Sequence, residues 1–396
     1  MNEAAGKWRI NHVKMVIGDS ILEGHLTIEN GVITEIAGGS CEGASASGIP
    51  TIDGDGGWLL PGFIDVHVHG GYGADFMEAN KDAYDTITKF HASKGTTRML
   101  ATTVTASRED IDSVLRAASA YIQHPMPYAA LAGVHLEGPF ISELWPGAQN
   151  PSFISPPRVD WLQEWNKQHP SIIKQLTFAP EKEGGLELVS WLAEQGITAA
   201  CGHTDAKYAD IIAAAEAGLT QAVHTYNAMR GLHHREPGTL GAVLTEDRIY
   251  AELIADGHHV HPAAIRLLMS AKTTDKVILI TDAMSAAGLG DGQYDLGGMT
   301  VDVLAGVAKL RVGGNLAGST LTMIDAFRFM LANTSLTVPQ VSTLASTNPA
   351  KQLGLLQETG TIAIGKLADL VLTDETFTAV HSTWVNGKQI YSSQSS

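Results

Sequence analysis

Short apolar runs alternate with amphipathic stretches through the middle of the chain. Apolar runs of about four to eight residues are typical of strands buried on both faces, and amphipathic stretches are typical of the helices that cover them. Eight strand-then-helix units predict a parallel (β/α)8 barrel, and counting alone leaves a doubly wound open sheet as the alternative. The expected strands are 62–68, 96–102, 131–136, 175–179, 197–202, 221–224, 251–255 and 277–281, and expected helices include 82–93, 108–122, 186–195 and 208–217.

The first sixty residues have a different pattern, with short alternating strands and turn dipeptides. Asn30-Gly31 stands between the alternating runs 24–28 and 32–36, which is a strong signature of a hairpin. The small and polar segment 38–48 is expected to be an exposed loop.

The end of the chain resembles its beginning. Residues 367–372 read as a strand and residues 384–390 as a closing hairpin. Because chain termini often lie close together, we expect both ends to pair into one small β-sandwich domain. The expected division is 1–60 and 361–396 for the small domain and 61–360 for the barrel.

Composition excludes several classes of protein. The chain has 396 residues, 44% of them hydrophobic and 17% charged, as in ordinary globular proteins. Its net charge of −16 argues against binding to nucleic acid or to an anionic membrane. The first ten residues carry three charges and no apolar core, unlike a signal peptide, and two cysteines form no disulfide framework. We therefore expect a cytoplasmic protein that binds neither nucleic acid nor membrane.

Histidines and carboxylates stand where the expected strands end. His67 and His69 close the first strand, and strand alternation puts them on the same side. All C-terminal strand ends of a barrel meet at one mouth. The ends of other expected strands add Glu137, His203, His224 and Asp282. Any one of the six could also be a buried histidine or a carboxylate at the start of a helix, but all six together favour a site for zinc or a similar divalent metal.

The order of these motifs resembles the amidohydrolase superfamily and, within it, the N-acetylglucosamine-6-phosphate deacetylase family. The His-x-His pair and residues 365–371 mark only the superfamily, whereas 136–139, 226–229 and 235–238 are more specific to the deacetylases. The matching segments run in order across almost the whole chain: 61–71, 135–140, 202–206, 224–229, 234–238, 255–259, 280–283, 316–319 and 365–371.

The resemblance implies that Glu137, His203 and His224 hold a divalent metal ion, zinc or iron. Many superfamily members bridge two metals with a carboxylated lysine, but no lysine stands at a matching strand end here, and Glu137 takes its place. Some deacetylases lack the His-x-His pair and use one metal. Since His67 and His69 are both present, a second ion shared with Glu137 and Asp282 is an open possibility.

The same resemblance implies hydrolysis of N-acetylglucosamine 6-phosphate to glucosamine 6-phosphate and acetate. A divalent metal lowers the pKa of a bound water towards about 7, which provides hydroxide to attack the acetyl carbonyl. Asp282 is the expected acid/base, which accepts the proton of the water and then delivers it to the departing amine.

An acidic protein that binds a phosphorylated sugar needs a local basic pocket, and residues 229–235 provide one. Arg235 offers a planar fork suited to phosphate, although a solvated basic loop is the alternative reading. Where the family often has a histidine before Asn-Pro, this chain has Gln149, which cannot titrate. Since some phosphate contacts in the family come from a neighbouring subunit, a homodimer is implied. The expected substrate-binding residues are Ala148, Gln149, Asn227, Ala228, Arg235, Asp256, Gly257, His258, His259, Leu316, Ala317 and Gly318.

Two other functions were compatible with parts of this pattern. One is a related hydrolase that acts on an N-acyl amino acid or a cyclic amide, because a carboxylate also satisfies an arginine. The other is a barrel without catalysis that serves as an assembly or regulatory protein. That function ranks last, because such a chain should lack several metal ligands or the acid/base, and all are present here.

Overall fold

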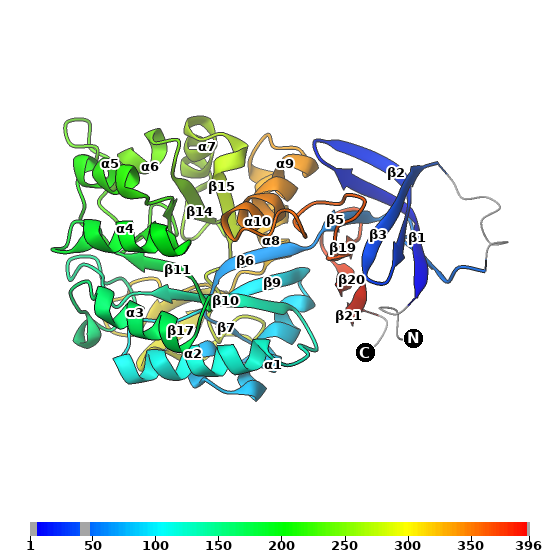
Figure 1. Cartoon of the computed structure of the whole chain (residues 1–396). Coiled ribbons are helices and arrows are strands. Elements are labelled where there is room, and N and C mark those ends of the chain that lie inside the picture. The colour runs from blue at the N-terminus through cyan, green and yellow to red at the C-terminus, as the bar shows by residue number, and fades with distance from the viewer. Residues whose placement is uncertain (1–5, 40–47, 394–396) are drawn as a thin grey trace.

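A computed structural model describes residues 6–39 and 48–393, and the middle of the chain forms a (β/α)8 barrel (Figure 1). Eight parallel strands pair in chain order, as the apolar runs predicted. Most of their residues are buried, because helices cover the outside and side chains fill the inside. The strands are β6 (Phe63–Val68), β9 (Thr96–Thr102), β10 (Ala130–Glu137), β11 (Ile173–Phe178), β12 (Thr198–Cys201), β13 (Gln221–Ala222), β14 (Tyr250–Ile254) and β15 (Val277–Ile280).

Helices lie between the barrel strands, and side chains cap the starts of α1 and α2. Asn80 accepts a hydrogen bond from the backbone of Ala83 at the start of α1, and Ser107 accepts one from Asp110 at the start of α2. The helices are α1 (Lys81–Ala92), α2 (Arg108–Ile122), α3 (Val159–Gln168), α4 (Gly185–Gln195), α5 (Tyr208–Ala217), α6 (Gly238–Thr245), α7 (Pro262–Ala271), α8 (Met323–Asn333), α9 (Val338–Ser342) and α10 (Asn348–Gln352).

The barrel has a seam between its first and last strands. Among the described residues, strand pairing runs from β6 to β15, and no ladder joins these two strands to each other. Instead, the backbone N–H of Asp282 donates to the carbonyl of His67 at 2.8 Å. Below them, the Asp65 carboxylate accepts hydrogen bonds from the Thr281 hydroxyl at 2.5 Å and from the His67 backbone at 3.2 Å. Isolated hydrogen bonds thus take the place of a continuous β-ladder between β6 and β15.

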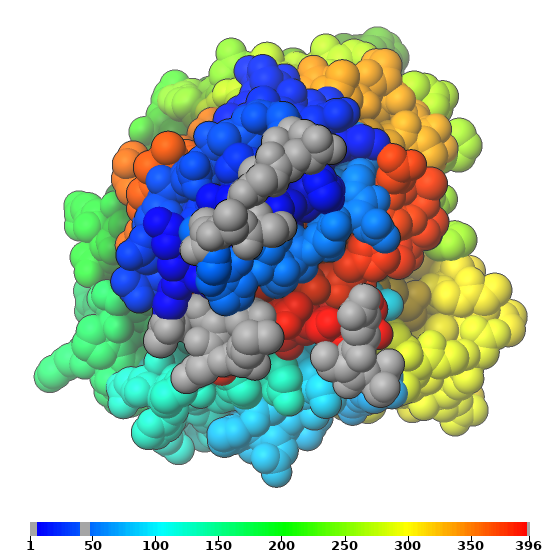
Figure 2. Space-filling view, turned by 90° about the vertical axis from the view of Figure 1, so that its right-hand side faces the viewer, coloured from blue at the N-terminus to red at the C-terminus, as the bar shows by residue number. Residues whose placement is uncertain are grey.

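Both ends of the chain build a second sheet, which confirms the predicted small β domain. The strands lie in the order β21-β20-β19-β5-β1-β2-β3, and β4 pairs with β1. Figure 2 shows the two terminal segments side by side on one face of the molecule. The rings of Trp8 and Trp384 lie 5.7 Å apart in its core. The strands are β1 (Lys7–Ile17), β2 (Ser20–Glu29), β3 (Val32–Gly38), β4 (Thr51–Asp53), β5 (Trp58–Pro61), β19 (Leu370–Thr373), β20 (Val380–Val385) and β21 (Lys388–Ser392).

The two predicted hairpins are present. Asn30-Gly31 joins β2 to β3, and Asn386-Gly387 joins β20 to β21. Most of the predicted loop at 38–48 lies outside the described residues, and the division of the domains at 60/61 and 360/361 stays a prediction. No helix in the described part of the chain is long and apolar enough to cross a membrane.

Sequence patterns did not predict a three-stranded antiparallel sheet that follows β15. Its strands are β16 (Gly292–Leu296), β17 (Met299–Leu304) and β18 (Val307–Leu310). Its buried side chains pack with Met284 and Val104 into a small core of their own. A short hairpin of β7 (Gly70–Gly71) and β8 (Ala74–Asp75) follows the first barrel strand.

Candidate active site and metal centre

Glu137 lies at the centre of the barrel mouth, at the end of β10. Its Oε1 is 3.2 Å from Nε2 of His203 and 3.1 Å from Nε2 of His224. The two imidazole nitrogens are 3.1 Å from each other. Ligand atoms about 2.1 Å from one tetrahedral ion are separated by roughly 3.4 Å. These three atoms are therefore spaced like the ligands of one metal ion.

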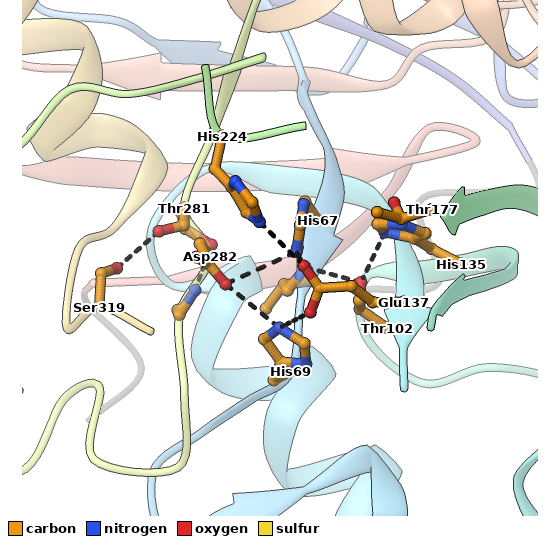
Figure 3. A network of polar contacts seen from close by, with 12 residues as sticks. His67, His69, Thr102, His135, Glu137, Thr177, His224, Thr281, Asp282 and Ser319 are labelled. Atoms are coloured by element: carbon orange, nitrogen blue, oxygen red, sulfur yellow. Dashed lines mark hydrogen bonds and ion pairs between the residues drawn. The ribbon is translucent and has the colours of Figure 1, made fainter. Parts of the chain in front are cut away.

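A second group of ligand atoms lies beside the first. Oε2 of Glu137 is 3.3 Å from Nε2 of His69, and the same nitrogen is 3.2 Å from Oδ1 of Asp282. Nε2 of His67 is 3.2 Å from Oε1 of Glu137 and 3.6 Å from Oδ1 of Asp282. Figure 3 shows these side chains pointing towards one another. The barrel thus brings together all six predicted ligands, and Glu137 contacts both groups: Oε1 is close to His203, His224 and His67, and Oε2 is close to His69.

The backbone at three strand ends adopts an uncommon conformation. His203, His224 and Asp282 have φ angles of 48°, 30° and 51°, in the left-handed region that residues other than glycine rarely adopt. Such a conformation costs about 1–3 kcal/mol and is typical of functional sites. Here it occurs at the residues whose side chains enter the mouth of the barrel.

Two observations test whether a divalent cation fits this cluster. Nε2 of His67 is buried and has no hydrogen-bond partner among the described residues, although Oε1 of Glu137 is 3.2 Å away. A nitrogen so close to an oxygen without hydrogen-bond geometry is suited to a shared ion. Imidazole and carboxylate together are also the donors that zinc and iron accept. The residues present therefore fit a divalent metal.

The carboxylates of the cluster are held in their charged form. Burial alone raises the pKa of Glu137, but His67, His203 and His224 lower it by more, so the pKa lies well below its usual value. Burial likewise raises the pKa of Asp282, and His67 and His69 bring it below the usual value. These two carboxylates are therefore charged at neutral pH, and they raise the pKa values of His67 and His69 in return.

Hydrogen bonds behind the imidazoles fix which nitrogen faces the cluster. Nδ1 of His203 donates to the Trp145 carbonyl at 2.9 Å, and Nδ1 of His224 donates to the Asn227 carbonyl at 3.2 Å. With Nδ1 occupied in this way, Nε2 remains free to bind a metal. Sequence reasoning missed Trp145, whose loop has no periodicity to mark it.

A cavity of about 380 Å³ opens above the cluster. Its size suits a small molecule such as a sugar phosphate. It is lined by the predicted substrate residues Ala148, Gln149, Asn227, Ala228, His259, Leu316 and Gly318, and by Leu144, Trp145, Pro146, Gly147, Leu296 and Asn315, which the sequence did not indicate.

Gln149 contacts Glu137 directly in this chain. Its Oε1 accepts a hydrogen bond from the Thr105 backbone at 2.6 Å, which turns the amide nitrogen the other way. That nitrogen donates to Oε2 of Glu137 at 2.5 Å. Gln149 thus orients the central carboxylate as well as lining the cavity.

The remaining predicted substrate residues lie outside the cavity. Asp256 lies behind it and accepts a hydrogen bond from Nδ1 of His259 at 2.7 Å, which orients that ring. Asp256 and His258 line a neighbouring cavity, while Ala317 is buried and Gly257 is half-buried. Arg235 is exposed, and its Nη1 lies 2.8 Å from Nε2 of His234. Within one chain, Arg235 therefore does not reach the cavity.

Comparison with known proteins agrees with this geometry. The model of the amidohydrolase family matches residues 58–390, which include the barrel and all six candidate ligands. The chain belongs to the amidohydrolase family.

Several relatives of this amidohydrolase are curated deacetylases. The chain is 43% identical to N-acetylglucosamine-6-phosphate deacetylase from Bacillus subtilis, over 79% of this chain and 80% of that protein. It is 39% identical to N-acetylgalactosamine-6-phosphate deacetylase from Escherichia coli O157:H7, over 83% and 87% of the two chains.

A solved structure shares the whole architecture of this amidohydrolase. It is a mutant of N-acetyl-D-glucosamine-6-phosphate deacetylase from Mycobacterium smegmatis in complex with N-acetyl-D-glucosamine-6-phosphate. The TM-score is 0.91 at 32% identity, and the match covers 98% of this chain and 100% of the other. The relatives therefore share the complete fold and not the barrel alone.

Proposed function

We propose that this amidohydrolase removes the acetyl group from N-acetylglucosamine 6-phosphate and yields glucosamine 6-phosphate and acetate. One observation carries the proposal: the cavity that contains the metal-ligand cluster also contains Asn227, Ala228 and His259, in a chain 43% identical to a curated deacetylase. A hydrolase for a different amide and a barrel without catalysis are not favoured, because the ligand cluster is complete and the relatives are deacetylases.

Glu137, His203 and His224 would hold the first divalent ion, and His67, His69 and Asp282 would share a second with Glu137. We propose zinc or iron for this centre, since imidazole and carboxylate suit both. When bound, such an ion polarises the amide carbonyl and lowers the pKa of water.

Asp282 transfers the proton in this proposal. Its carboxylate borders the cavity and is held in its charged form, so it can accept a proton from the attacking water. As the new C–O bond forms and the C–N bond breaks, Asp282 returns that proton to the amine nitrogen. The departing group therefore leaves as a neutral amine, which is a far better leaving group than an amide anion.

The phosphate end of the substrate needs positive charge or hydrogen-bond donors. His259 is held by Asp256, and Asn227 lies at the cavity wall, so both can contact the sugar phosphate. Arg235 is exposed and does not line the cavity of its own chain. We propose that the protein is a homodimer in which Arg235 contacts the phosphate bound by the partner subunit.

Acetate release is the test of this function. The purified protein is assayed as isolated, after metal removal, and after reloading with zinc or iron(II). Metal-dependent release from N-acetylglucosamine 6-phosphate, and much slower release from N-acetylglucosamine and from an N-acetyl amino acid, is the expected result.

The assay includes N-acetylgalactosamine 6-phosphate, because a relative 39% identical is named for that sugar. Faster turnover of the galactosamine epimer would contradict the proposed substrate, but the proposed deacetylation reaction would still hold. A protein that binds metal and turns over neither sugar phosphate would contradict both.

A further inference from the structure

Glu252 is a fully buried carboxylate in the middle of β14, and nothing in the proposed reaction uses it. It has 0% of its surface exposed. Strand β14 otherwise consists of Tyr250, Ala251, Leu253 and Ile254. A buried charge is costly unless it is paired and hydrogen-bonded. Its contacts therefore indicate what the carboxylate does.

Both oxygens of Glu252 are occupied by hydrogen-bond donors from other barrel strands. Oε1 accepts hydrogen bonds from the amide nitrogens of Gln175 at 2.8 Å and Gln221 at 2.5 Å. The amide oxygen of Gln221 accepts a further hydrogen bond from Gln352 at 2.7 Å. Because these amides fix the carboxylate, its second oxygen has a defined direction.

That second oxygen faces a metal-ligand histidine. Oε2 of Glu252 lies 2.9 Å from Nδ1 of His67, and both side chains have no exposed surface. An ionised carboxylate only accepts hydrogen bonds, so Nδ1 of His67 carries the hydrogen. The other ring nitrogen then presents its lone pair to the cluster.

His67 differs in this respect from the other three histidines of the cluster. His203 and His224 donate to neutral backbone carbonyls, and Nδ1 of His69 has no partner in the part of the chain that the structure describes. A carboxylate behind an imidazole makes the imidazole a stronger donor to a metal. His67 also lies within ligand distance of Glu137 and His224 on one side and of His69 and Asp282 on the other.

We propose that Glu252 is a positioning residue for His67: it fixes the ring with Nε2 towards the metal and sets the affinity for the ion that His67 binds. The inference rests on the metal centre of the proposed function but not on the identity of the substrate. Substitution of such an outer partner typically lowers metal affinity about 10–100-fold.

The test measures metal binding rather than turnover. Wild type, Glu252→Gln, His67→Ala and the double variant are loaded with zinc and titrated with a competing chelator, and zinc bound per chain is determined by mass spectrometry. His67→Ala should lose one zinc ion. Glu252→Gln should keep that ion but bind it about 10–100-fold more weakly. The double variant should bind zinc no more weakly than His67→Ala alone, because Glu252 acts through His67.

Asp369→Asn is the matched control. Asp369 is also a buried carboxylate, 3% exposed, and it pairs with Arg98 at 2.7 Å in another part of the molecule. Both neutralising substitutions should lower the unfolding temperature, but only Glu252→Gln should change zinc affinity.

Three results would overturn the proposal: unchanged zinc affinity in Glu252→Gln, an equal change in Asp369→Asn, or additive effects of Glu252→Gln and His67→Ala. If Glu252→Gln does not fold, Glu252→Asp shortens the side chain and keeps its charge. Glu252→Asp should lower the affinity for the same ion to a smaller extent. Unchanged zinc affinity in this variant would also overturn the proposal. Since no substrate is present, failure of the deacetylase assay would leave this result standing.

Discussion

Oδ1 of Asp282 lies 3.2 Å from Nε2 of His69, so the proposed acid/base is in direct contact with the His-x-His pair. The two residues follow the last and the first strands of the barrel. Imidazole next to this carboxylate favours its charged form, which is the form that accepts a proton. The proposed proton transfer and the proposed second metal group therefore share one carboxylate.

Replacing Asp282 by asparagine should remove proton transfer and keep the shape of the site. We expect kcat for acetate release to fall about 10²–10⁴-fold. Asp291→Asn, at an exposed aspartate of the same segment, should leave kcat unchanged. A kcat for Asp282→Asn within tenfold of wild type would exclude Asp282 as the acid/base.

Gln149→Ala should destabilise the metal-free protein by about 1–3 kcal/mol, because it leaves the buried Thr105 N–H without its acceptor. Urea unfolding of the metal-free protein measures this difference. The matched control is Gln123→Ala, which changes an exposed glutamine and should alter the free energy of unfolding by less than about 0.5 kcal/mol. Equal stability of Gln149→Ala and wild type would show that these hydrogen bonds contribute nothing.

Mixing two impaired variants tests the proposed role of Arg235 in a neighbouring subunit. Arg235→Ala should raise KM for the sugar phosphate at least roughly tenfold, the loss expected for a charged hydrogen bond. After unfolding and refolding together, Arg235→Ala and Asp282→Asn chains should form mixed dimers with one complete site. Recovered activity at low substrate would support action across the dimer, whereas no recovery would place Arg235 in its own site or outside it.

His91 should make stability depend on pH independently of metal. It is fully buried, donates to the Gly70 carbonyl at 3.0 Å, and burial lowers its pKa from 6.5 to about 4. Between these values the unfolded chain binds more protons than the folded chain, so the free energy of unfolding falls as pH falls. The loss approaches about 3 kcal/mol near pH 4.

His91→Gln keeps a hydrogen-bond donor and cannot titrate. Its free energy of unfolding, measured with urea from pH 7 to pH 4.5, should therefore decrease less steeply than that of wild type. Parallel curves would mean that His91 is protonated without cost in the folded protein.

Metal removal should lower the unfolding temperature, because an ion that binds only the folded chain stabilises it by mass action. At an ion concentration 100 times the Kd this stabilisation is about 2.7 kcal/mol, which corresponds to roughly 3 °C for a chain of 396 residues. Calorimetry of stripped and zinc-reloaded protein measures the shift. Glu137→Gln should show almost none, and a full shift in that variant would place the ion elsewhere.

Local patterns were sufficient to predict the barrel and the polar residues that gather at its mouth. The eight strands are continuous apolar runs, and topology alone brings their polar ends together although the chain separates them widely. His203 and Asp282 could be found in this way, because each directly follows such a run.

Residues whose role depends on distant partners could not be predicted. The hydrogen-bond partners of Glu252 lie 31, 77 and 185 positions away, although a charge inside the apolar run 250–254 was a usable signal. Strand β16 is mostly exposed and therefore lacks a clear apolar pattern. Arg235 lies in a surface loop. The conformation of such a loop leaves no periodic hydrophobic pattern in the sequence, so the position of Arg235 could not be predicted.

The seam of the barrel has a consequence for the order in which the molecule is made. Asp65 and Thr281, which bond across it, are 216 positions apart, so a growing chain completes β6 long before it reaches β15. A chain released before residue 277 would already carry Glu137, His203 and His224, and β6 would be paired with β9, but the other edge of β6 would have no strand beside it. Only the arrival of the last strand brings Asp282 to His67 and His69. Translation therefore completes the two candidate ligand groups in sequence, and the group that contains Asp282 is complete only after the whole barrel sheet has been made.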